Sequence, residues 1–566
     1  MKISKTKRLT LHLTAVIMAL CAFTACTQGG EYDNDNGNGG GSGGGGGSHN
    51  QESGQITASA NRLYIDAMLD KYYLYNDAYR QTSRNYNQSY SNFLDDVLDQ
   101  MHAKGQNPKD GFEYDGEWYF YSYVEREKSA AGRAEGSLYD EIPREYAYGT
   151  GMYLVLVRLS SNPFYYGVTP LWVYPDSPAY KAGIRRGDLI TQINGKNTTL
   201  ASLKGSYADL LDDEFYSKKS YKLSIEADDG SLNTVTVETD YYYPNPILFE
   251  RIYNVAGRIA GYLVYNGFDA AYDNDLLEVF DRFKAAGVED VILDLRYNGG
   301  GHVISSRLLS AVLAGPHCKG KVFAYYRYND ERMKKDYDIT DLSDATAFPC
   351  ELFDGDYERY ADSYGFENVY VIGGRNTASA SELTINSLRG LDRNVILIGC
   401  EPTNGKDVGM EVTTSTRSFD GYVYTLAPIS FQTYNAKGES DYDDGFTPDI
   451  KPAPIQSSSG TYHTYDEFMP EDWGMLYPGS NGSIQKFDYL ADALYAIAGG
   501  TLSSSDLSVV TDGGETALTA VVPRCKMMLV QPATRSGNGN EGLRIRRRNP
   551  FENNMVKPLD DRDRQF

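Results

Sequence analysis

Apolar side chains follow a helical period in the first stretch of this chain that can build a core. From residue 57 they recur at i, i+3, i+4, i+7 and i+8, which predicts an amphipathic helix with one buried face. The positions concerned are Ile65, Met68, Leu69, Tyr72 and Tyr73. A second helix is expected over 93–101, so residues 57–147 are predicted to form a helical N-terminal domain.

Short apolar runs separated by turns replace the helical pattern over residues 148–243. The runs YGTGMYLVLV and DLITQI flank a short helical segment, SPAYKAG, and the turn INGKN comes last. In this order the pieces resemble a PDZ domain. The resemblance implies that the loop of Gly149, Thr150, Gly151 and Met152 holds a peptide's terminal carboxylate with backbone N–H groups, while the peptide adds as a strand. A domain that serves only as a spacer is the alternative.

Strands and helices alternate over residues 244–499. The segment GRIAGYLVYNGF predicts a strand, and DNDLLEVFDRFKAAG predicts a helix with one apolar face. Further strands are expected in VEDVILDLRYNGGG, NVYVIGG and NVILIGCE, and a helix begins after NTASAS. This alternation predicts an α/β domain with a mostly parallel sheet, within a multidomain chain. Residues 500–566 form a C-terminal extension to which we assign no role.

The first 25 residues have the order of an export signal. A basic stretch, MKISKTKR, precedes an apolar run, LTAVIMALCAF, which is too short to be a comfortable membrane span. Ala25 and Cys26 then resemble the cleavage site of a bacterial lipoprotein, with lipid attached to Cys26. Residues 26–56, rich in glycine, are expected to form a flexible tether. An ordinary signal with a chance cysteine is the alternative.

The net charge argues against one class of partner, and no sequence pattern indicates a cofactor. The 566 residues carry a formal net charge of −23, which argues against nucleic acid because phosphate binding needs a basic surface. No spacing of potential ligands matches a metal site, so we expect no metal and no other cofactor. We expect the protein to be exported and lipid-anchored in the bacterial cell envelope, at the outer membrane.

A serine activated by lysine is the chemistry that the remaining motifs favour. Ser379 and Ser381 lie where a strand feeds a helix, and Lys406 follows the next strand. A helix N-terminus supplies free N–H groups and a positive dipole end, which both suit an oxyanion. A lysine is a base only when neutral, so its pKa must fall from about 10.4 toward 7, as burial can achieve. A Ser–His–Asp site is possible only through His302, His317 or His463.

Taken together, these motifs resemble the C-terminal processing, or tail-specific, proteases. The matching features, in chain order, are the PDZ-like segment, DLRYNGGG, TASASE, GCEPTNGK and GFTPDIKP. The resemblance covers roughly residues 60 to 500 and implies a catalytic domain with a crotonase-like ββα superhelix. It also implies a serine endopeptidase that cleaves exported or unfolded proteins, whose C-termini the PDZ domain recognises.

Carried over residue by residue, the resemblance makes Ser379 the nucleophile and Lys406 the general base. The oxyanion hole would be the backbone N–H groups of Ala380 and Gly300. Ser381 stays an alternative nucleophile, because it lies 25 residues before Lys406, the family's usual separation, whereas Ser379 lies 27 residues before it.

Two departures from the family pattern bear on activity. Gly299 stands in place of the usual proline of the glycine turn, which loosens the loop. Met410 stands where the family often has a glutamine that orients the lysine, and a thioether is only a weak hydrogen-bond acceptor. A catalytically inactive lipoprotein scaffold of the same fold, binding peptides or small ligands, is therefore the second hypothesis.

Overall fold

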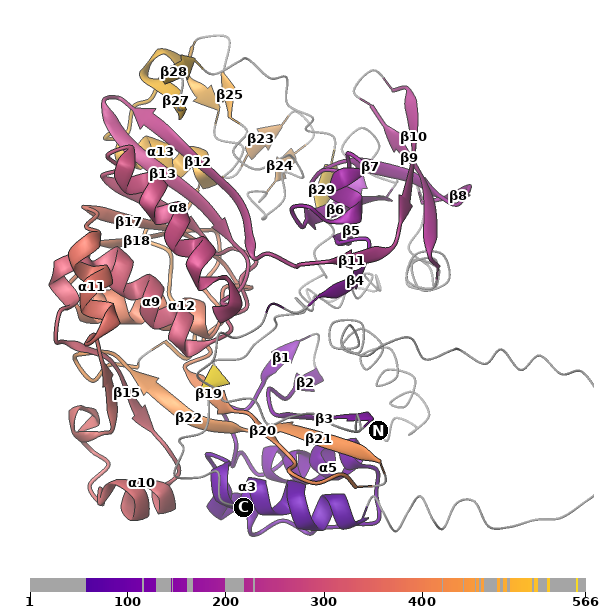
Figure 1. The fold of residues 1–566 in the computed structure, drawn as a ribbon, viewed down its shortest axis with the longest axis vertical. Helices are drawn as coiled ribbons and strands as arrows, with labels where there is room; N and C mark the ends of the chain where they lie inside the picture. The colour runs from indigo at the N-terminus through magenta and orange to yellow at the C-terminus, as the bar shows by residue number, and fades with distance from the viewer. Residues whose placement is uncertain are drawn as a thin grey trace, which may run out of the picture.

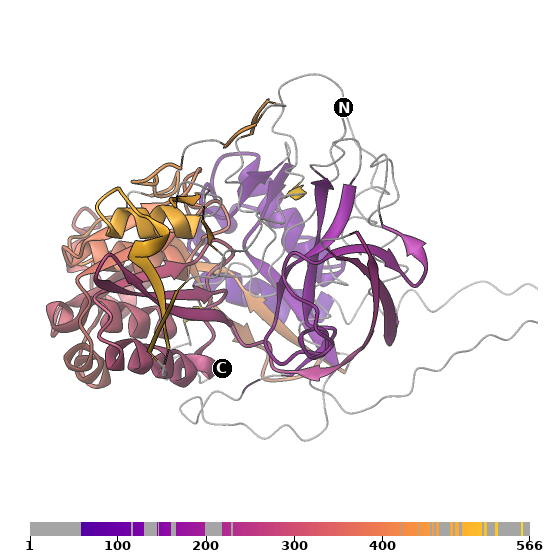
Figure 2. The ribbon, with the colours of Figure 1, turned by 90° about the horizontal axis from the view of Figure 1, so that it is seen from above.

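The computed structural model describes residues 58–128, 144–198, 218–462 and 476–517, apart from short gaps, together with the short strands 527–529 and 556–557. The predicted export signal, Cys26 and the tether lie outside the described residues. Figure 1 shows the N-terminal elements at the bottom, a strand-rich segment on the right and an α/β part on the left. Seen from above in Figure 2, the strand-rich segment and the α/β part lie side by side.

A seven-stranded sheet forms the centre of the α/β part, in the order β18-β17-β14-β13-β12-β27-β28. The pairings from β13 to β18 are parallel and those from β13 to β28 are antiparallel, so the parallel prediction holds for one half of the sheet. A tight turn joins β12 to β13, and strands joined in that way run antiparallel. The strands are β12 (Ile247–Val255), β13 (Arg258–Tyr265), β14 (Asp290–Asp294), β17 (Asn368–Ile372), β18 (Val395–Ile398), β27 (Leu507–Thr511) and β28 (Gly514–Ala517).

Alternate residues of the sheet face two different cores, because successive strand side chains point to opposite faces. Val291 and Leu293 of β14 belong to the core beneath α8, α9 and α12. Ile292, between them, belongs to the core beneath α13, which the strand-rich segment also joins. The helices are α8 (Asp273–Ala285), α9 (Val303–Ala314), α12 (Ala380–Gly390) and α13 (Tyr489–Ile497).

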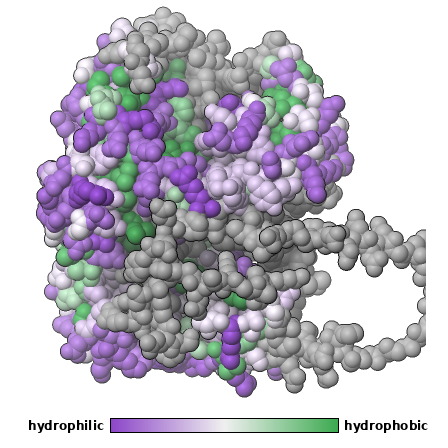
Figure 3. Space-filling view, viewed as in Figure 1, coloured by the Kyte–Doolittle hydropathy of each residue, from purple (hydrophilic) through white to green (hydrophobic). Residues whose placement is uncertain are grey.

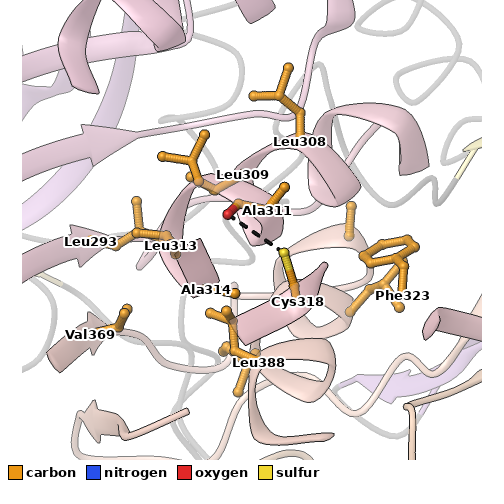
Figure 4. Packing of buried hydrophobic residues seen from close by; sticks show 14 of the residues in the cluster. Leu293, Leu308, Leu309, Ala311, Leu313, Ala314, Cys318, Phe323, Val369 and Leu388 are labelled. Atoms are coloured by element: carbon orange, nitrogen blue, oxygen red, sulfur yellow. Dashed lines mark hydrogen bonds between the residues drawn. The ribbon is translucent and has the colours of Figure 1, made fainter. Parts of the chain in front are cut away.

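Figure 4 shows the first core around Cys318, which lies among apolar side chains from several elements. Its Sγ is 3.2 Å from the carbonyl oxygen of Gly315 and 3.9 Å from that of Ala311. Burial raises the pKa of Cys318 to about 11. The side chain is therefore a protonated thiol that packs as a small apolar group.

The strand-rich segment forms a second sheet in the order β10-β9-β7-β6-β5-β29. Its last strand, β29 (Met527–Leu529), comes from the C-terminal extension and pairs antiparallel with β5. Where the chain enters and leaves this segment, β4 and β11 pair antiparallel as a ribbon. The elements are β4 (Ala147–Gly149), β5 (Met152–Leu159), β6 (Tyr166–Val173), α6 (Pro178–Lys181), β7 (Leu189–Ile193), β8 (Lys196–Asn197), β9 (Ser220–Glu226), β10 (Leu232–Glu238) and β11 (Asp240–Tyr242).

The two helices predicted near the N-terminus are confirmed, and the structure adds small strands that the sequence pattern did not predict. The first predicted helix is η2 (Asn61–Ile65) with α3 (Asp66–Tyr72), and the second is α5 (Tyr90–His102). The structure also adds the short helix α4 (Asn76–Tyr79) and the strands β1 (Phe112–Tyr114), β2 (Glu117–Tyr119) and β3 (Tyr123–Lys128). β3 pairs with β21 (Tyr422–Ala427) of the α/β part. The N-terminal helices also share one core with Val408 and Met410 of β19 (Val408–Glu411).

A five-stranded sheet contains β19 and links the N-terminal helices to the α/β part. Its order is β16-β15-β22-β19-β30. The members besides β19 are β15 (Val322–Arg327), β16 (Cys350–Leu352), β22 (Ile429–Tyr434) and β30 (Val556–Lys557). Around it lie α10 (Asp330–Tyr337), α11 (Asp356–Ser363) and β20 (Thr413–Thr414). The C-terminal extension thus adds strands to three sheets of the molecule.

The described surface in Figure 3 is mainly hydrophilic, as the large negative charge suggests. Among the described helices, none combines the length and the apolar character that a membrane span requires.

The packing of α8 on β13 generates a stability prediction. A Cβ at Gly261 would come within 2.6 Å of the Phe283 ring, so that ring lies directly on the strand. Phe283→Ala should lower the free energy of unfolding by about 3–5 kcal/mol, because the sheet cannot collapse into the cavity. Urea unfolding followed by tryptophan fluorescence measures this. The control is Glu278→Ala on the exposed face of the same helix, which should change stability by no more than about 0.5 kcal/mol; equal losses would contradict the prediction.

Candidate active site

The segment that joins β17 to α12 carries hydroxyls at three alternate positions, and the structure uses them differently. Thr377 Oγ1 donates to the Leu295 carbonyl oxygen at 2.8 Å, and Ser381 Oγ donates to the Asn298 carbonyl oxygen at 3.0 Å. Ser379 Oγ is fully buried and has no hydrogen-bond partner among the described residues. Thr377 and Ser381 therefore fasten the segment to the turn after β14, and Ser379 is the one of the three whose hydroxyl has no such bond to the described residues.

Ser379 has an unusual backbone conformation. It precedes α12 with a φ of 61°, a region that costs a non-glycine residue about 1–3 kcal/mol unless its surroundings hold it there. Its N–H donates to Glu382 Oε2 at 3.0 Å, and its carbonyl oxygen accepts the Leu383 N–H at 2.8 Å. These bonds hold the sharp turn from strand to helix through the backbone of Ser379, with Glu382 at the capping-box position of α12.

The glycine turn lies against the start of α12. Gly300 has a φ of +116°, and a Cβ there would come within 2.7 Å of Ser379 Cβ and 3.0 Å of the Ala380 nitrogen. Only a residue without a side chain fits at this position. The structure thus brings both predicted oxyanion donors, Ala380 and Gly300, to Ser379. The Gly300 N–H donates to Asn298 Oδ1 at 2.9 Å, so in this state it is engaged within its own turn.

A buried carboxylate connects the serine to the lysine. Glu382 Oε2 accepts the backbone N–H of Ser379 at 3.0 Å and that of Lys406 at 2.9 Å. Its Oε1 accepts the Gly405 N–H at 2.7 Å and the Thr403 hydroxyl at 2.6 Å. Glu382 is 0% exposed and Lys406 is 1% exposed. One carboxylate therefore holds the backbones of both predicted catalytic residues within hydrogen-bond reach of the same atom.

The ionisation of Glu382 is finely balanced. Burial raises its pKa to about 7 from the ordinary 4.5, and the hydrogen bonds it accepts oppose this rise. All of its hydrogen-bond partners are donors, so protonation must disrupt at least one of them. Because the pKa is raised on folding, the stability linked to this proton is fully present below about pH 4.5 and is lost as the pH rises through 7. Sequence reasoning missed this role, although the S-x-x-E pattern marks Glu382 as a capping-box residue.

An aromatic ring from the N-terminal segment lies beside the lysine. Lys406 Nζ is 4.2 Å from the centroid of the Tyr121 ring. The Tyr121 hydroxyl donates to Asn404 Oδ1 at 2.9 Å, and Tyr121 is only 8% exposed. No local pattern points to Tyr121, because it is far from Lys406 in the sequence and only the packing of the N-terminal segment brings the two together.

Among the described residues, neither His302 nor His317 supplies Ser379 with a hydrogen-bond partner. His302 Nδ1 accepts the Ala270 N–H at 3.2 Å and lies 4.0 Å from Asp269 Oδ1. His317 is exposed, and His463 lies outside the described residues. Within the described ranges, no group of three or more His, Cys, Asp or Glu side chains is placed to hold a metal ion.

The loop predicted to hold a peptide carboxylate is fastened through its carbonyl groups. Thr150 O accepts an N–H from α6, and Gly151 O accepts one from the residue after β6, both at 2.8 Å. A Cβ at Gly151 would come within 2.1 Å of Ser177 Cβ, so the close approach of α6 requires glycine here. Gly149 ends β4 and Met152 begins β5, which places the loop at the start of the edge strand of the segment's own sheet.

Comparisons with known proteins agree with this geometry. Residues 259–452, which contain Ser379, Lys406 and Gly300, match the model of peptidase family S41, and residues 171–219 match that of a PDZ domain. The chloroplastic C-terminal processing peptidase of Tetradesmus obliquus is 26% identical over 300 residues, which cover 49% of this chain and 55% of that protein. A "Probable CtpA-like serine protease" of Staphylococcus saprophyticus is 24% identical over 277 residues, covering 49% of this chain and 48% of that protein. The chain spans about half the length of these curated relatives.

A solved structure shows the same fold over most of the chain. A Bacteroides fragilis protein assigned to the S41 proteases has a TM-score of 0.56 at 23% identity, covering 77% of this chain and 97% of that one. Both domain types are matched in the expected order and the motif residues gather at one site, so the chain resembles the C-terminal processing peptidases over its PDZ and S41 segments.

Proposed function

We propose that this protein is a serine endopeptidase in which Ser379 is the nucleophile and Lys406 the general base. The observation that carries the proposal is the carboxylate of Glu382, which accepts the backbone N–H groups of both residues. The same network leaves the Ser379 hydroxyl without a hydrogen bond to the described residues, whereas Ser381 is committed to Asn298. The match of residues 259–452 to peptidase family S41 supports peptide-bond hydrolysis as the reaction.

In the proposed reaction, Ser379 Oγ attacks the scissile carbonyl carbon while its proton passes to neutral Lys406 Nζ. The carbonyl oxygen becomes an oxyanion next to the Ala380 N–H at the start of α12, where free N–H groups and the helix dipole favour negative charge. The protonated lysine then gives its proton to the leaving amine. Water, deprotonated by the lysine, releases the acyl group and restores the serine.

The site must rearrange before this reaction can begin. Ser379 and Lys406 are 0% and 1% exposed, so a peptide reaches them only when a covering segment moves. The Gly300 N–H must also turn from Asn298 Oδ1 to contribute to the oxyanion hole. Catalytic hydrogen bonds often tighten only when substrate is bound, and we regard the structure as the closed, substrate-free state.

The PDZ domain is proposed to recognise the C-termini of unfolded or exported protein substrates. The edge of β5 supports this role because it already accepts an added strand, β29 of the same chain. The pairing of Met527 with Leu159 and of Leu529 with Val157 means that β29 runs toward the loop at Gly149. A bound peptide with its carboxylate in that loop would run in the same direction.

The PDZ domain also touches the glycine turn of the site. The Trp172 ring lies 6.1 Å from the Tyr297 ring, centroid to centroid, and Arg186 lies over the same tyrosine at 5.5 Å. Tyr297 directly precedes Asn298, whose side chain holds the Gly300 N–H. A peptide bound to the PDZ domain therefore has a short physical connection to the oxyanion hole.

A catalytically inactive scaffold of the same fold is the second candidate. Met410 in place of the usual glutamine and the complete burial of Ser379 favour it. The two candidates differ in one observable, which is peptide-bond cleavage that depends on Ser379.

We propose that the protein is exported and lipid-anchored through Cys26 in the bacterial cell envelope, at the outer membrane. The support is the order of basic residues, apolar run and cysteine at the N-terminus. Cys26→Ser should move the protein from the membrane pellet to the soluble fraction after cell breakage, and processed protein that stays in the pellet would contradict the lipid anchor.

The dyad predicts a sharp contrast among three variants in casein cleavage. Ser379→Ala should reduce kcat/KM by at least about a thousandfold, and Lys406→Arg should be nearly as inactive, because arginine cannot be deprotonated. Ser381→Ala should keep activity apart from a stability loss, because its hydroxyl only binds Asn298 O. The wild-type rate should rise with pH through an apparent pKa between neutral and mildly alkaline, as the lysine loses its proton.

Circular dichroism is the control that each of these variants is folded. An active Lys406→Arg variant would show that Lys406 is not the base. Full activity in Ser379→Ala together with its loss in Ser381→Ala would reassign the nucleophile.

The PDZ proposal predicts a preference for peptides with a free carboxylate and an apolar last residue. Amidating the C-terminus of such a peptide should weaken binding at least several-fold, because the N–H groups of the loop lose their anionic partner. Fluorescence anisotropy with the Ser379→Ala protein measures both affinities without cleavage. Equal affinity for the acid and the amide would exclude the carboxylate loop.

A further inference from the structure

We propose that Tyr121 of the N-terminal segment is a positioning residue for Lys406, which keeps the amine in place and shields it from water. This inference rests on the proposed Ser–Lys chemistry. It assigns to the N-terminal segment a part in the active site that the family motifs do not contain.

The contact itself is direct. Lys406 Nζ lies 4.2 Å from the Tyr121 ring centroid, a distance at which an aromatic face attracts an ammonium group. Lys406 is 1% exposed and Tyr121 is 8% exposed, so the ring is part of the wall that closes the lysine off from solvent.

Tyr121 is itself held by hydrogen bonds that lead to the segment carrying Ser379. Its hydroxyl donates to Asn404 Oδ1 at 2.9 Å. The Asn404 N–H donates to the Thr377 carbonyl oxygen at 3.0 Å, two residues before Ser379. The ring is thus fastened to the segment that carries the serine while it packs on the lysine.

The backbone next to Tyr121 is fixed as well. Ser122 donates its N–H and its hydroxyl to the fully buried Asp110 carboxylate, at 2.9 Å and 2.8 Å. The Ser122 hydroxyl also accepts the Ile429 N–H of β22 at 2.9 Å. Because residue 122 is bonded to both parts of the molecule, Tyr121 has little freedom to leave the lysine.

The position that usually orients the lysine has a different role in this chain. Met410 is completely buried in the core that the N-terminal helices share with β19. The N-terminal segment also binds the residue after the lysine, since Lys109 Nζ lies 2.6 Å from Asp407 Oδ2. The N-terminal segment therefore packs against Met410 and also restrains Lys406.

Two effects of the ring on Lys406 act in opposite directions. The aromatic face favours the ammonium form by about 1.5 pKa units in a desolvated site. Exclusion of water disfavours it by up to about 3–5 pKa units for a fully buried lysine, so shielding is the larger effect. The ionisable side chains around the site include Asp110, Glu382, Tyr442 and Asp407 with its partner Lys109.

The experiment compares Tyr121→Ala with Tyr121→Phe, which keeps the ring. Tyr121→Ala should admit water and raise the pKa of Lys406 by about one unit, which lowers kcat at pH 7 about tenfold and moves the rise of the pH–rate profile to higher pH. KM should change little. Tyr121→Phe should keep the wild-type profile, and so should Tyr119→Ala, which removes a half-buried tyrosine at the end of β2, two residues before Tyr121.

A second readout does not depend on proteolysis. In a Ser379→Ala background, trace acetylation with acetic anhydride across pH, followed by mass spectrometry of the Lys406 peptide, reports the titration of this amine. The midpoint should rise with Tyr121→Ala and stay constant with Tyr121→Phe. If Tyr121→Ala does not fold, Tyr121→Val, which leaves part of the space of the ring open to water, should raise the midpoint by a smaller amount.

The proposal is overturned if a folded Tyr121→Ala protein, or the folded Tyr121→Val protein in its place, keeps the wild-type midpoint, or if Tyr121→Phe or Tyr119→Ala shifts it equally. A wild-type protein that shows no Ser379-dependent cleavage would instead refute the proposed function. The acetylation titration would still decide the role of Tyr121 in that case.

Discussion

The buried carboxylate of Glu382 is the interaction on which the rest of the site depends. A buried carboxylate is tolerated only when hydrogen bonds replace its lost water, and Glu382 obtains them from Ser379, Thr403, Gly405 and Lys406. To satisfy one charge, the start of α12 and the loop before β19 must meet. The requirement for donors therefore also brings the proposed nucleophile and the proposed base together, and it holds Ser379 at a positive φ.

The parts outside the α/β core meet at this site from two directions. The N-terminal segment reaches Lys406 through Tyr121 and Asp407 through Lys109. The PDZ domain reaches the glycine turn through the contact of Trp172 with Tyr297. Both parts therefore contribute contacts to the site, which depends on the packing of the whole molecule.

Local periodicity was sufficient to predict the elements that carry the site. The apolar face of α8 and the helix that begins after NTASAS have a clear 3.6-residue period or cap signal, and both are confirmed. The small strands β1 to β3 were not predicted, because three to six residues of mixed polarity show no reliable alternation. The antiparallel half of the sheet was also missed, since its direction depends on the turn before β13 and on β27 and β28, which come from the far end of the chain.

The sequence by itself determined which residues could do the chemistry: a helix-start serine, a glycine turn and a buried lysine in fixed chain order. It could not separate Ser379 from Ser381, because both lie in one short motif and spacing favoured one while register favoured the other. Only the tertiary structure decided how each hydroxyl is used, since the acceptor of Ser381 is Asn298 O, which lies on a different strand's turn. Tyr121 also became visible only in three dimensions, because a contact between residues this far apart depends on packing and not on any local pattern.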